Sequence, residues 1–207
     1  MSLRAAGKYL PVQWVCDFRE ALNETIGLEG TSAVWRAIQT PIRCSKGSAK
    51  DLEKSVDFSC YGAICASVSE LYGASGARII LNRSGRSAFT RLLKRTAAMV
   101  GADHPGFPTG SVSLPFEVRM QPIVRLLGLL SDMESVCETV GGEVRFRILS
   151  CPECTGRTAQ VGLCHSMAGM VQSAVDWFGG GESATVSEIR CMAQGDSECE
   201  FSVAGNL

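Results

Sequence analysis

The stretch "EIRCMAQGDSECEF", residues 188–201, combines a hairpin pattern with three side chains of metal-binding type. Two strand-like runs, "ATVSEIRCMAQ" and "ECEFSVA", are joined by "GDS" (195–197), whose glycine and aspartate favour a tight connection. That connection folds Cys199 back toward Cys191. Glu188 and Cys191 would point to opposite faces of a regular strand, so only a β-bulge or a strand end can bring them together. The stretch therefore predicts a β-hairpin that carries candidate metal ligands.

A further ligand is expected from "LCH", where Cys164 or His165 begins a helix. A helix N-terminus lowers the pKa of a thiol and so favours the thiolate. Thiolates with one carboxylate or imidazole suit zinc in tetrahedral geometry, and four protein ligands would leave no open position. The expected site is therefore a structural one.

"CPEC", residues 151–154, leaves the ligand set open. A CxxC pair is a common half of a zinc site, so Cys151 and Cys154 could combine with Cys191 and Cys199. Spacing does not exclude this choice. Buried thiols beside an exposed glutamate, with no metal, remain the other alternative.

The remaining pattern predicts an α+β fold, with an antiparallel β-sheet packed against several α-helices. "GGEVRFRILSC" alternates apolar and charged residues as a strand with one exposed face does, and "LCHSMAGMVQSAVDWF" has apolar residues at helical spacing, ended by "GGGE". Upstream, apolar periodicity predicts helices over 11–26, 31–40 (capped by Thr31 or Ser32), 51–72 and 123–133. Turn residues predict a turn at "NRSGRS", followed by a further helix, and a loop over 101–115.

Composition narrows the class of protein. The chain has 207 residues, 45% hydrophobic and 20% charged, with a net charge of -1, so one compact domain with a helical N-terminal extension is expected and nucleic-acid binding is not. Neither a membrane span nor a signal peptide is evident, which predicts a cytoplasmic protein. Its ten cysteines are then interpreted as thiols or metal ligands rather than disulfides. Those outside the last third, interpreted as structural, are Cys16, Cys44, Cys60, Cys65 and Cys137.

Three segments, "SCPEC", "CHSMAGMVQSAVDWFGG" and "EIRCMAQGDSECEFSV", resemble the 4-vinyl reductase domain, a small-molecule-binding module named after a bacteriochlorophyll biosynthesis protein. "ELYGASGARIILNRSGRSAFTRLL" resembles the wider superfamily of TRAPP subunits and haem-based nitric-oxide sensors. The resemblance covers residues 58–207, with a zinc-binding core over 144–207, and leaves 1–57 as the N-terminal extension. It implies an α+β fold, a homodimer and an apolar pocket between sheet and helices.

The same resemblance implies a zinc ion held by Cys164, Glu188, Cys191 and Cys199. The interval from Cys164 to Glu188 is one residue longer than in the family. Either the extra glycine of "FGGGES" absorbs the difference or His165 takes the place of Cys164. The expected pocket is lined by Phe146, Ile148, Met167, Met170, Val171, Ala174, Trp177 and Phe178, although residues at such spacing are more often simply core.

Catalysis finds little support in the sequence. It contains no nucleophile elbow, phosphate loop or dinucleotide fingerprint, and its two histidines are His104 and His165. A reductase needs a hydride source, so the family's name is not taken as an activity. We expect a zinc-stabilised carrier or assembly factor for a hydrophobic or tetrapyrrole ligand of chlorophyll type, in photosynthetic pigment biosynthesis. The alternatives are the sensory module of a regulator, or an interaction subunit with a vestigial pocket that docks a protein partner through N-terminal helices bearing Trp14, Phe18 and Trp35.

Overall fold

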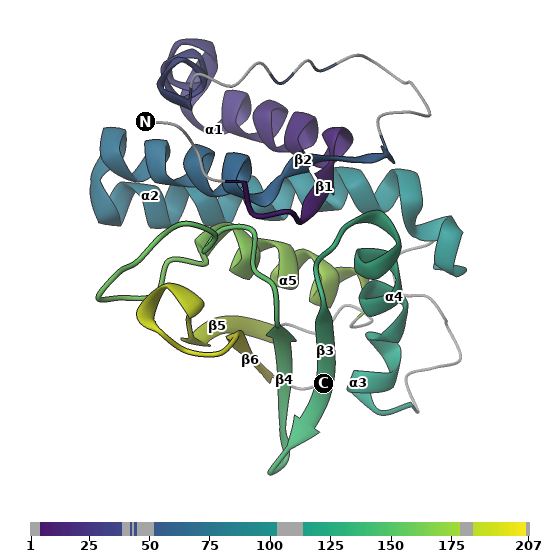
Figure 1. Ribbon diagram of the computed structural model, residues 1–207. Helices are drawn as coiled ribbons and strands as arrows, with labels where there is room; N and C mark the ends of the chain where they lie inside the picture. The colour runs from purple at the N-terminus through teal and green to yellow at the C-terminus, as the bar shows by residue number, and fades with distance from the viewer. Residues whose placement is uncertain are drawn as a thin grey trace.

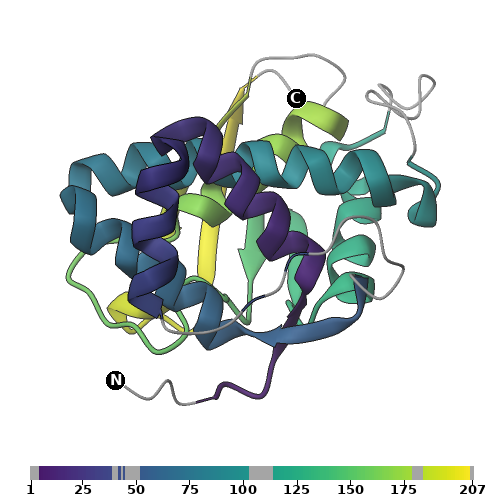
Figure 2. The ribbon, with the colours of Figure 1, turned by 90° about the horizontal axis from the view of Figure 1, so that it is seen from above.

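The computed structural model describes residues 5–38, 42, 44, 52–102, 114–178 and 184–205. Its elements form successive layers: α1 (Val12–Ile38) lies on α2 (Phe58–Thr96), α2 lies on α5 (His165–Phe178), and α5 covers a four-stranded sheet (Figure 1). Seen from above, α1 crosses over α2 (Figure 2). The α+β architecture expected from the sequence is confirmed.

The first helix is divided by a glycine. Gly27 has φ 75° and ψ 170°, a conformation that glycine adopts readily and that breaks the helical path of α1. The two predicted N-terminal helices are therefore the two halves of α1, and the second half begins before the expected cap, with Thr31 buried inside it. Trp14 and Phe18 are also buried and pack against Phe89 and Tyr61 of α2, so these two rings belong to the core and are not available for docking.

The second helix corrects two expectations. Residues 54–57 form strand β2 (Lys54–Asp57) instead of the start of a helix, and Asp57 caps α2 by accepting a hydrogen bond from the Ser59 amide. The helix changes direction at Gly73 (φ 69°), where an end was predicted. The turn predicted at "NRSGRS" does not exist, because that segment is helical and Gly85 is buried in it.

A short antiparallel ribbon and a disulfide hold the N-terminal segment. β1 (Tyr9–Pro11), which the sequence analysis missed, pairs with β2. Cys16 and Cys44 form a disulfide with an S–S distance of 2.07 Å, so the interpretation of these two cysteines as free thiols was wrong. Cys65 and Cys137 are buried thiols and Cys60 is a half-buried one.

The sheet has the strand order β3–β4–β6–β5, and all its neighbouring strands are antiparallel. Its strands are β3 (Ser135–Val140), β4 (Glu143–Ile148), β5 (Ala184–Arg190) and β6 (Cys199–Gly205). β4, β5 and β6 were predicted, whereas β3 was missed. The edge beyond β3 is flanked by α3 (Phe116–Arg119) and α4 (Gln121–Leu130), which follow the 3₁₀ turn η2 (Ala97–Val100).

Part of what the sequence predicts falls outside the residues that the structure describes. The predicted loop over 101–115 and "GGGE" lie almost wholly outside the described residues, as does His104. No helix in the described part of the chain has the length and apolar character needed to cross a membrane.

Candidate metal centre

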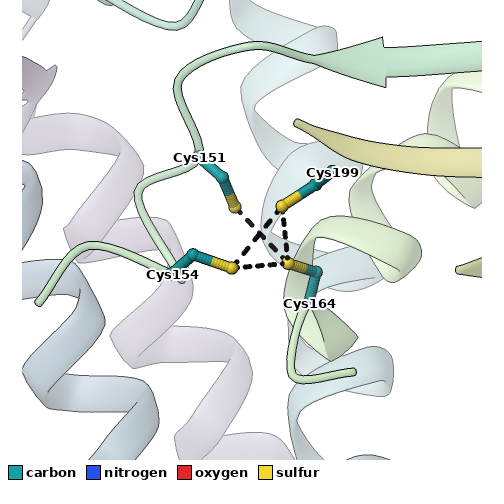
Figure 3. A group of neighbouring side chains, drawn as sticks. All are labelled: Cys151, Cys154, Cys164 and Cys199. Atoms are coloured by element: carbon teal, nitrogen blue, oxygen red, sulfur yellow. Dashed lines mark hydrogen bonds between the residues drawn. The ribbon is translucent and has the colours of Figure 1, made fainter. Parts of the chain in front are cut away.

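Five cysteines from four segments meet at the end of the sheet. We call Cys151, Cys154, Cys164, Cys191 and Cys199 the cysteine cluster; every member is buried. Cys151 and Cys154 come from the loop after β4 (the CPEC loop, residues 151–156), Cys164 precedes α5, Cys191 follows β5 and Cys199 begins β6. Figure 3 shows four of these sulfurs pointing toward one another.

The sulfur atoms lie at contact distance. Cys164 Sγ is 3.1 Å from Cys154 Sγ, 3.3 Å from Cys199 Sγ, 3.5 Å from Cys151 Sγ and 3.8 Å from Cys191 Sγ. Cys154 Sγ is 3.5 Å from both Cys191 Sγ and Cys199 Sγ. Zn–S bonds of about 2.3 Å in a tetrahedron place the sulfurs about 3.8 Å apart, so the cluster needs only a small expansion to hold a zinc ion.

Two overlapping groups of four residues have their donor atoms within 4.8 Å of one another. One contains Cys164, Glu188, Cys191 and Cys199, the set that the resemblance implies. The other contains Cys151, Cys154, Cys164 and Cys199. His165 belongs to neither group among the described residues; its side chain is half-buried at the start of α5, and burial lowers its pKa.

A β-bulge brings Glu188 to the cluster. Glu188 pairs with Phe201, but Arg190 pairs with Glu200, so the register of β5 against β6 shifts by one residue at Ile189. The extra residue reverses the facing of the chain that follows, and Cys191 lies just past the strand end. A bulge or a strand end was expected to bring Glu188 and Cys191 together, and the structure contains both.

The backbone around Cys164 supports Glu188 directly. The Cys164 amide donates to both carboxylate oxygens of Glu188, at 3.1 and 3.3 Å, while the Cys164 carbonyl accepts from Ala168 in the first turn of α5. Gly162 gives the carboxylate room, because a Cβ there would lie 2.4 Å from Glu188 Oε2. The Glu188 carboxylate and the start of α5 are thereby held together.

Backbone amides of the hairpin connection also form hydrogen bonds at the cluster. The Cys191 amide donates to Asp196 Oδ2 at 2.8 Å, and the Met192 amide donates to Cys199 Sγ at 3.4 Å. Gly195 has φ 100°, as the tight connection requires. An amide directed at a sulfur stabilises its thiolate form, the form that binds metals.

Glu153, at the centre of the CPEC loop, is a site residue that the sequence analysis missed. Its fully buried carboxylate accepts from the Ser166 amide (2.9 Å), the Ser166 hydroxyl (2.7 Å) and the Met167 amide (3.0 Å) at the start of α5. Burial raises the pKa of Glu153 to about 7. On the other side of the loop, Gly62 of α2 lies so close that a Cβ would be 2.7 Å from the Thr155 carbonyl. An acidic residue between two cysteines was the one signal available in the sequence.

Without a bound cation, few of the acidic side chains at the cluster can lose their protons. Burial raises the pKa of Cys151, and burial followed by the neighbouring Cys191 raises the pKa of Glu188 to about 8. The pKa of Cys191 is lowered because Cys154, Cys164 and Cys199 hydrogen-bond to its sulfur. One thiolate therefore forms readily, and further ionisation needs a positive charge at the centre.

The predicted pocket residues all lie in the core. Each of the eight is at most 6% exposed, and all of them belong to the continuous apolar core of the protein. The Trp177 ring nitrogen donates to the Ala102 carbonyl at 3.1 Å, which ties the end of α5 to the segment after α2. Their role in ligand binding stays a prediction.

Comparison with known proteins finds a family model that spans the cysteine cluster. Residues 144–204 match the family model of the V4R domain, the 4-vinyl reductase domain that the sequence resembles. The match covers less than a third of the chain. No curated protein sequence matches the chain.

Solved structures show the fold around the V4R domain. An H-NOX protein from S. oneidensis, in its Fe(II)NO state, superposes with a TM-score of 0.58 at 14% identity, covering 96% of this chain and 100% of that chain. An unliganded Fe(II) H-NOX protein from K. algicida gives 0.54 at 13% identity, over 96% and 97%. The segment that matches the V4R model thus lies within an H-NOX-like fold that extends over nearly the whole chain. Together, the match and the fold indicate a small-molecule-binding or sensory module.

Proposed function

We propose that this protein is a zinc-stabilised ligand-binding module, a carrier or assembly factor for an apolar ligand such as a tetrapyrrole of chlorophyll biosynthesis. The observation that carries the proposal is the convergence of five buried cysteines and Glu188 at the end of a V4R domain. Vinyl reduction is not part of the proposal.

Zinc would act as a cross-link in this protein. Cys164, Glu188, Cys191 and Cys199 supply three thiolates and a carboxylate, a donor set that suits tetrahedral zinc. These residues come from the start of α5 and from both strands of the hairpin. A bound ion would hold α5 against the sheet at one end, and the amides of Cys164 and Met192 would orient two of its ligands.

The ligand would bind between α5 and the sheet, toward the end of α5 opposite the metal. Phe146 and Ile148 face this region from β4, and Trp177 and Phe178 lie at the far end of the helix. Because these side chains are packed together, a planar ligand fits only if α5 moves away from the sheet at that end. A metal cross-link at the other end would act as the fixed point of this movement.

Native purification tests the proposal. The full chain, isolated from its native host, is expected to carry zinc and to show the absorbance and mass of a bound pigment, and native mass spectrometry would show whether it is the homodimer that the resemblance implies. Colourless protein that also fails to bind added porphyrins would contradict the carrier role.

Fluorescence gives a site-specific version of this test. Porphyrin added to the ligand-free protein should quench Trp177, and Trp177→Phe should remove most of the quenching while leaving the fold intact. Trp35→Phe is the matched control, since Trp35 lies on α1, in the layer farthest from the sheet. Quenching that depends equally on both tryptophans would place the ligand elsewhere.

A sensory module is the second candidate, favoured by the likeness to H-NOX domains. A sensor should change its interaction with a separate partner when ligand binds, whereas a carrier should release the ligand to an acceptor. Pull-down experiments with and without the pigment, read by mass spectrometry, separate the two roles.

A further inference from the structure

The cysteine cluster offers more donors than one tetrahedral ion can use. Five thiols and the Glu188 carboxylate converge, whereas zinc takes four ligands. We propose that the centre binds two zinc ions that share the thiolates of Cys164 and Cys199. Cys151 and Cys154 would complete the coordination of one ion, and Glu188 and Cys191 that of the other.

The two overlapping groups of donors give the connectivity of this centre. Cys164 and Cys199 are the members common to both groups, and their sulfurs are 3.3 Å apart. Each ion would then have four ligands, with no donor left over and no position open to water. With Zn–S bonds of about 2.3 Å on both sides of this shared pair, the ions would lie about 3.2 Å apart.

Charge balance favours a second ion. One zinc bound by Cys164, Glu188, Cys191 and Cys199 would leave Cys151 and Cys154 as protonated thiols, because both are buried and would have no cation of their own. A second dication would replace those two thiol protons, so the net charge of the buried centre would not change. The extra ion therefore adds coordination bonds without adding a buried net charge.

The CPEC loop is held in position independently of any metal. Glu153 accepts hydrogen bonds from the first turn of α5, and α2 packs so closely on the loop at Gly62 that a Cβ there would lie 2.7 Å from the Thr155 carbonyl oxygen. Both cysteines of the loop are consequently directed at the cluster (Figure 3). A CxxC pair that faced the cluster only by chance would not need a buried carboxylate as its anchor.

One contact must lengthen when both ions bind. Cys154 Sγ and Cys191 Sγ are 3.5 Å apart, but as terminal ligands of different ions they would lie roughly 6 Å apart. The Cys154 side chain has room to turn, because a hollow of about 320 Å³ lies beside the CPEC loop, lined in part by Cys151, Cys154 and Met192. The second ion thus predicts that the Cys154 sulfur turns away from Cys191 while Glu153 keeps the loop backbone in place.

Metal stoichiometry of the full chain tests this proposal, which rests on the zinc of the proposed function. Protein purified under reducing conditions and dialysed against buffered zinc is analysed for zinc, iron and acid-labile sulfide. Two zinc ions per chain are expected. One ion would overturn the shared centre but leave the zinc of the proposed function standing, whereas none would overturn both. Iron with sulfide would show an iron–sulfur cluster and also overturn the proposal.

Variants that lack the ligands of one ion test which residues bind each ion. Cys151→Ser combined with Cys154→Ser should lower the count from two to one, and Glu188→Gln should do the same from the other side. Cys137→Ala, a buried cysteine in β3 outside the cluster, is the matched control and should keep two. A CPEC double variant that still binds two ions would contradict the assignment.

Spectroscopy of the unaltered chain avoids any dependence on the folding of variants. X-ray absorption at the zinc edge should show a zinc–zinc vector near 3.2 Å. Cobalt titration should saturate at two equivalents, with magnetic coupling in the second step. A single-step titration without coupling, or a zinc-edge spectrum lacking the metal–metal vector, would overturn the bridged centre.

Discussion

Glu153 connects the CPEC loop to α5 through one buried carboxylate that accepts three hydrogen bonds from Ser166 and Met167. Glu153→Ala would leave these donors buried without a partner and should lower the free energy of unfolding by about 2–4 kcal/mol. Glu153→Gln keeps an acceptor oxygen and should cost clearly less. Urea unfolding of both variants, with zinc present, checks the order; equal losses would refute the anchoring role.

Asp17 is a second buried carboxyl, far from the cluster in sequence, which contacts Arg95 and accepts from Gln13. Burial nevertheless raises its pKa. The folded protein therefore binds this proton more tightly than the unfolded chain, so the contribution of Asp17 to stability is greatest below its unfolded pKa and is lost as the pH rises through its folded pKa.

Replacing Asp17 by asparagine should remove that loss. The stability of Asp17→Asn relative to the unaltered protein is expected to increase as the pH rises from about 3.8, the ordinary pKa of an aspartate, toward neutrality. Urea unfolding at a series of pH values measures the difference. A relative stability that falls over this range would show that the contact with Arg95 outweighs the cost of burial.

At the scale of elements, the crossing of α2 and α5 depends on glycine. A Cβ at Gly85 would lie 2.1 Å from the Ser166 carbonyl oxygen, and one at Gly169 would lie 2.1 Å from that of Asn82. Gly85→Ala should therefore lower the free energy of unfolding by about 1–3 kcal/mol, although alanine is the better helix former by about 1 kcal/mol.

Gly128 of α4 is the matched control, because nothing lies within 4 Å of a Cβ built there. Gly128→Ala should raise the free energy of unfolding by about 0.5–1 kcal/mol. Thermal unfolding of the two variants under one set of conditions measures both effects. Stabilisation by both substitutions would show that the helices can separate without cost.

Gly85 also shows why some of the elements could not be predicted from the sequence. In "NRSGRS" Gly85 was interpreted as a turn, because a glycine that permits close helix packing and a glycine that permits a turn look alike until the partner helix is known. β1 and β2 were missed for a related reason: residues 9–11 pair with residues 54–57, and neither short run carries a pattern of its own. Local periodicity was sufficient for α4, α5, β4, β5 and β6.

The candidate metal centre was predictable only in part. Residue type and spacing brought Cys191 and Cys199 together across a hairpin, which the register of β5 and β6 explains. The position of the CPEC loop could not follow from spacing, since it depends on the long-range contact of Glu153 with α5. Nor could the sequence show that the two cysteine groups overlap at Cys164 and Cys199.

At the scale of the whole molecule, a metal bound at the cysteine cluster would stabilise a different part from the one that the helical layers stabilise. The cysteine cluster joins the CPEC loop, α5 and the hairpin, whereas α1 and α2 pack against each other through apolar side chains with no metal ligand between them in the described part. Free zinc at 100 times its dissociation constant would add about 2.7 kcal/mol to the free energy of unfolding. A strong chelator should remove that contribution.

The loss of stability after zinc is removed should be uneven along the chain. After chelation, hydrogen exchange is expected to accelerate first in residues 151–167 and 188–201, which contain the ligands, while the buried amides of α1 and α2 keep their protection because their packing is unchanged. Adding zinc back should restore the slow exchange, and the Cys137→Ala control should behave as the unaltered protein does. If exchange accelerated equally in α1, the metal would stabilise the molecule as one cooperative unit, and α5 could not pivot about the cysteine cluster as ligand entry requires.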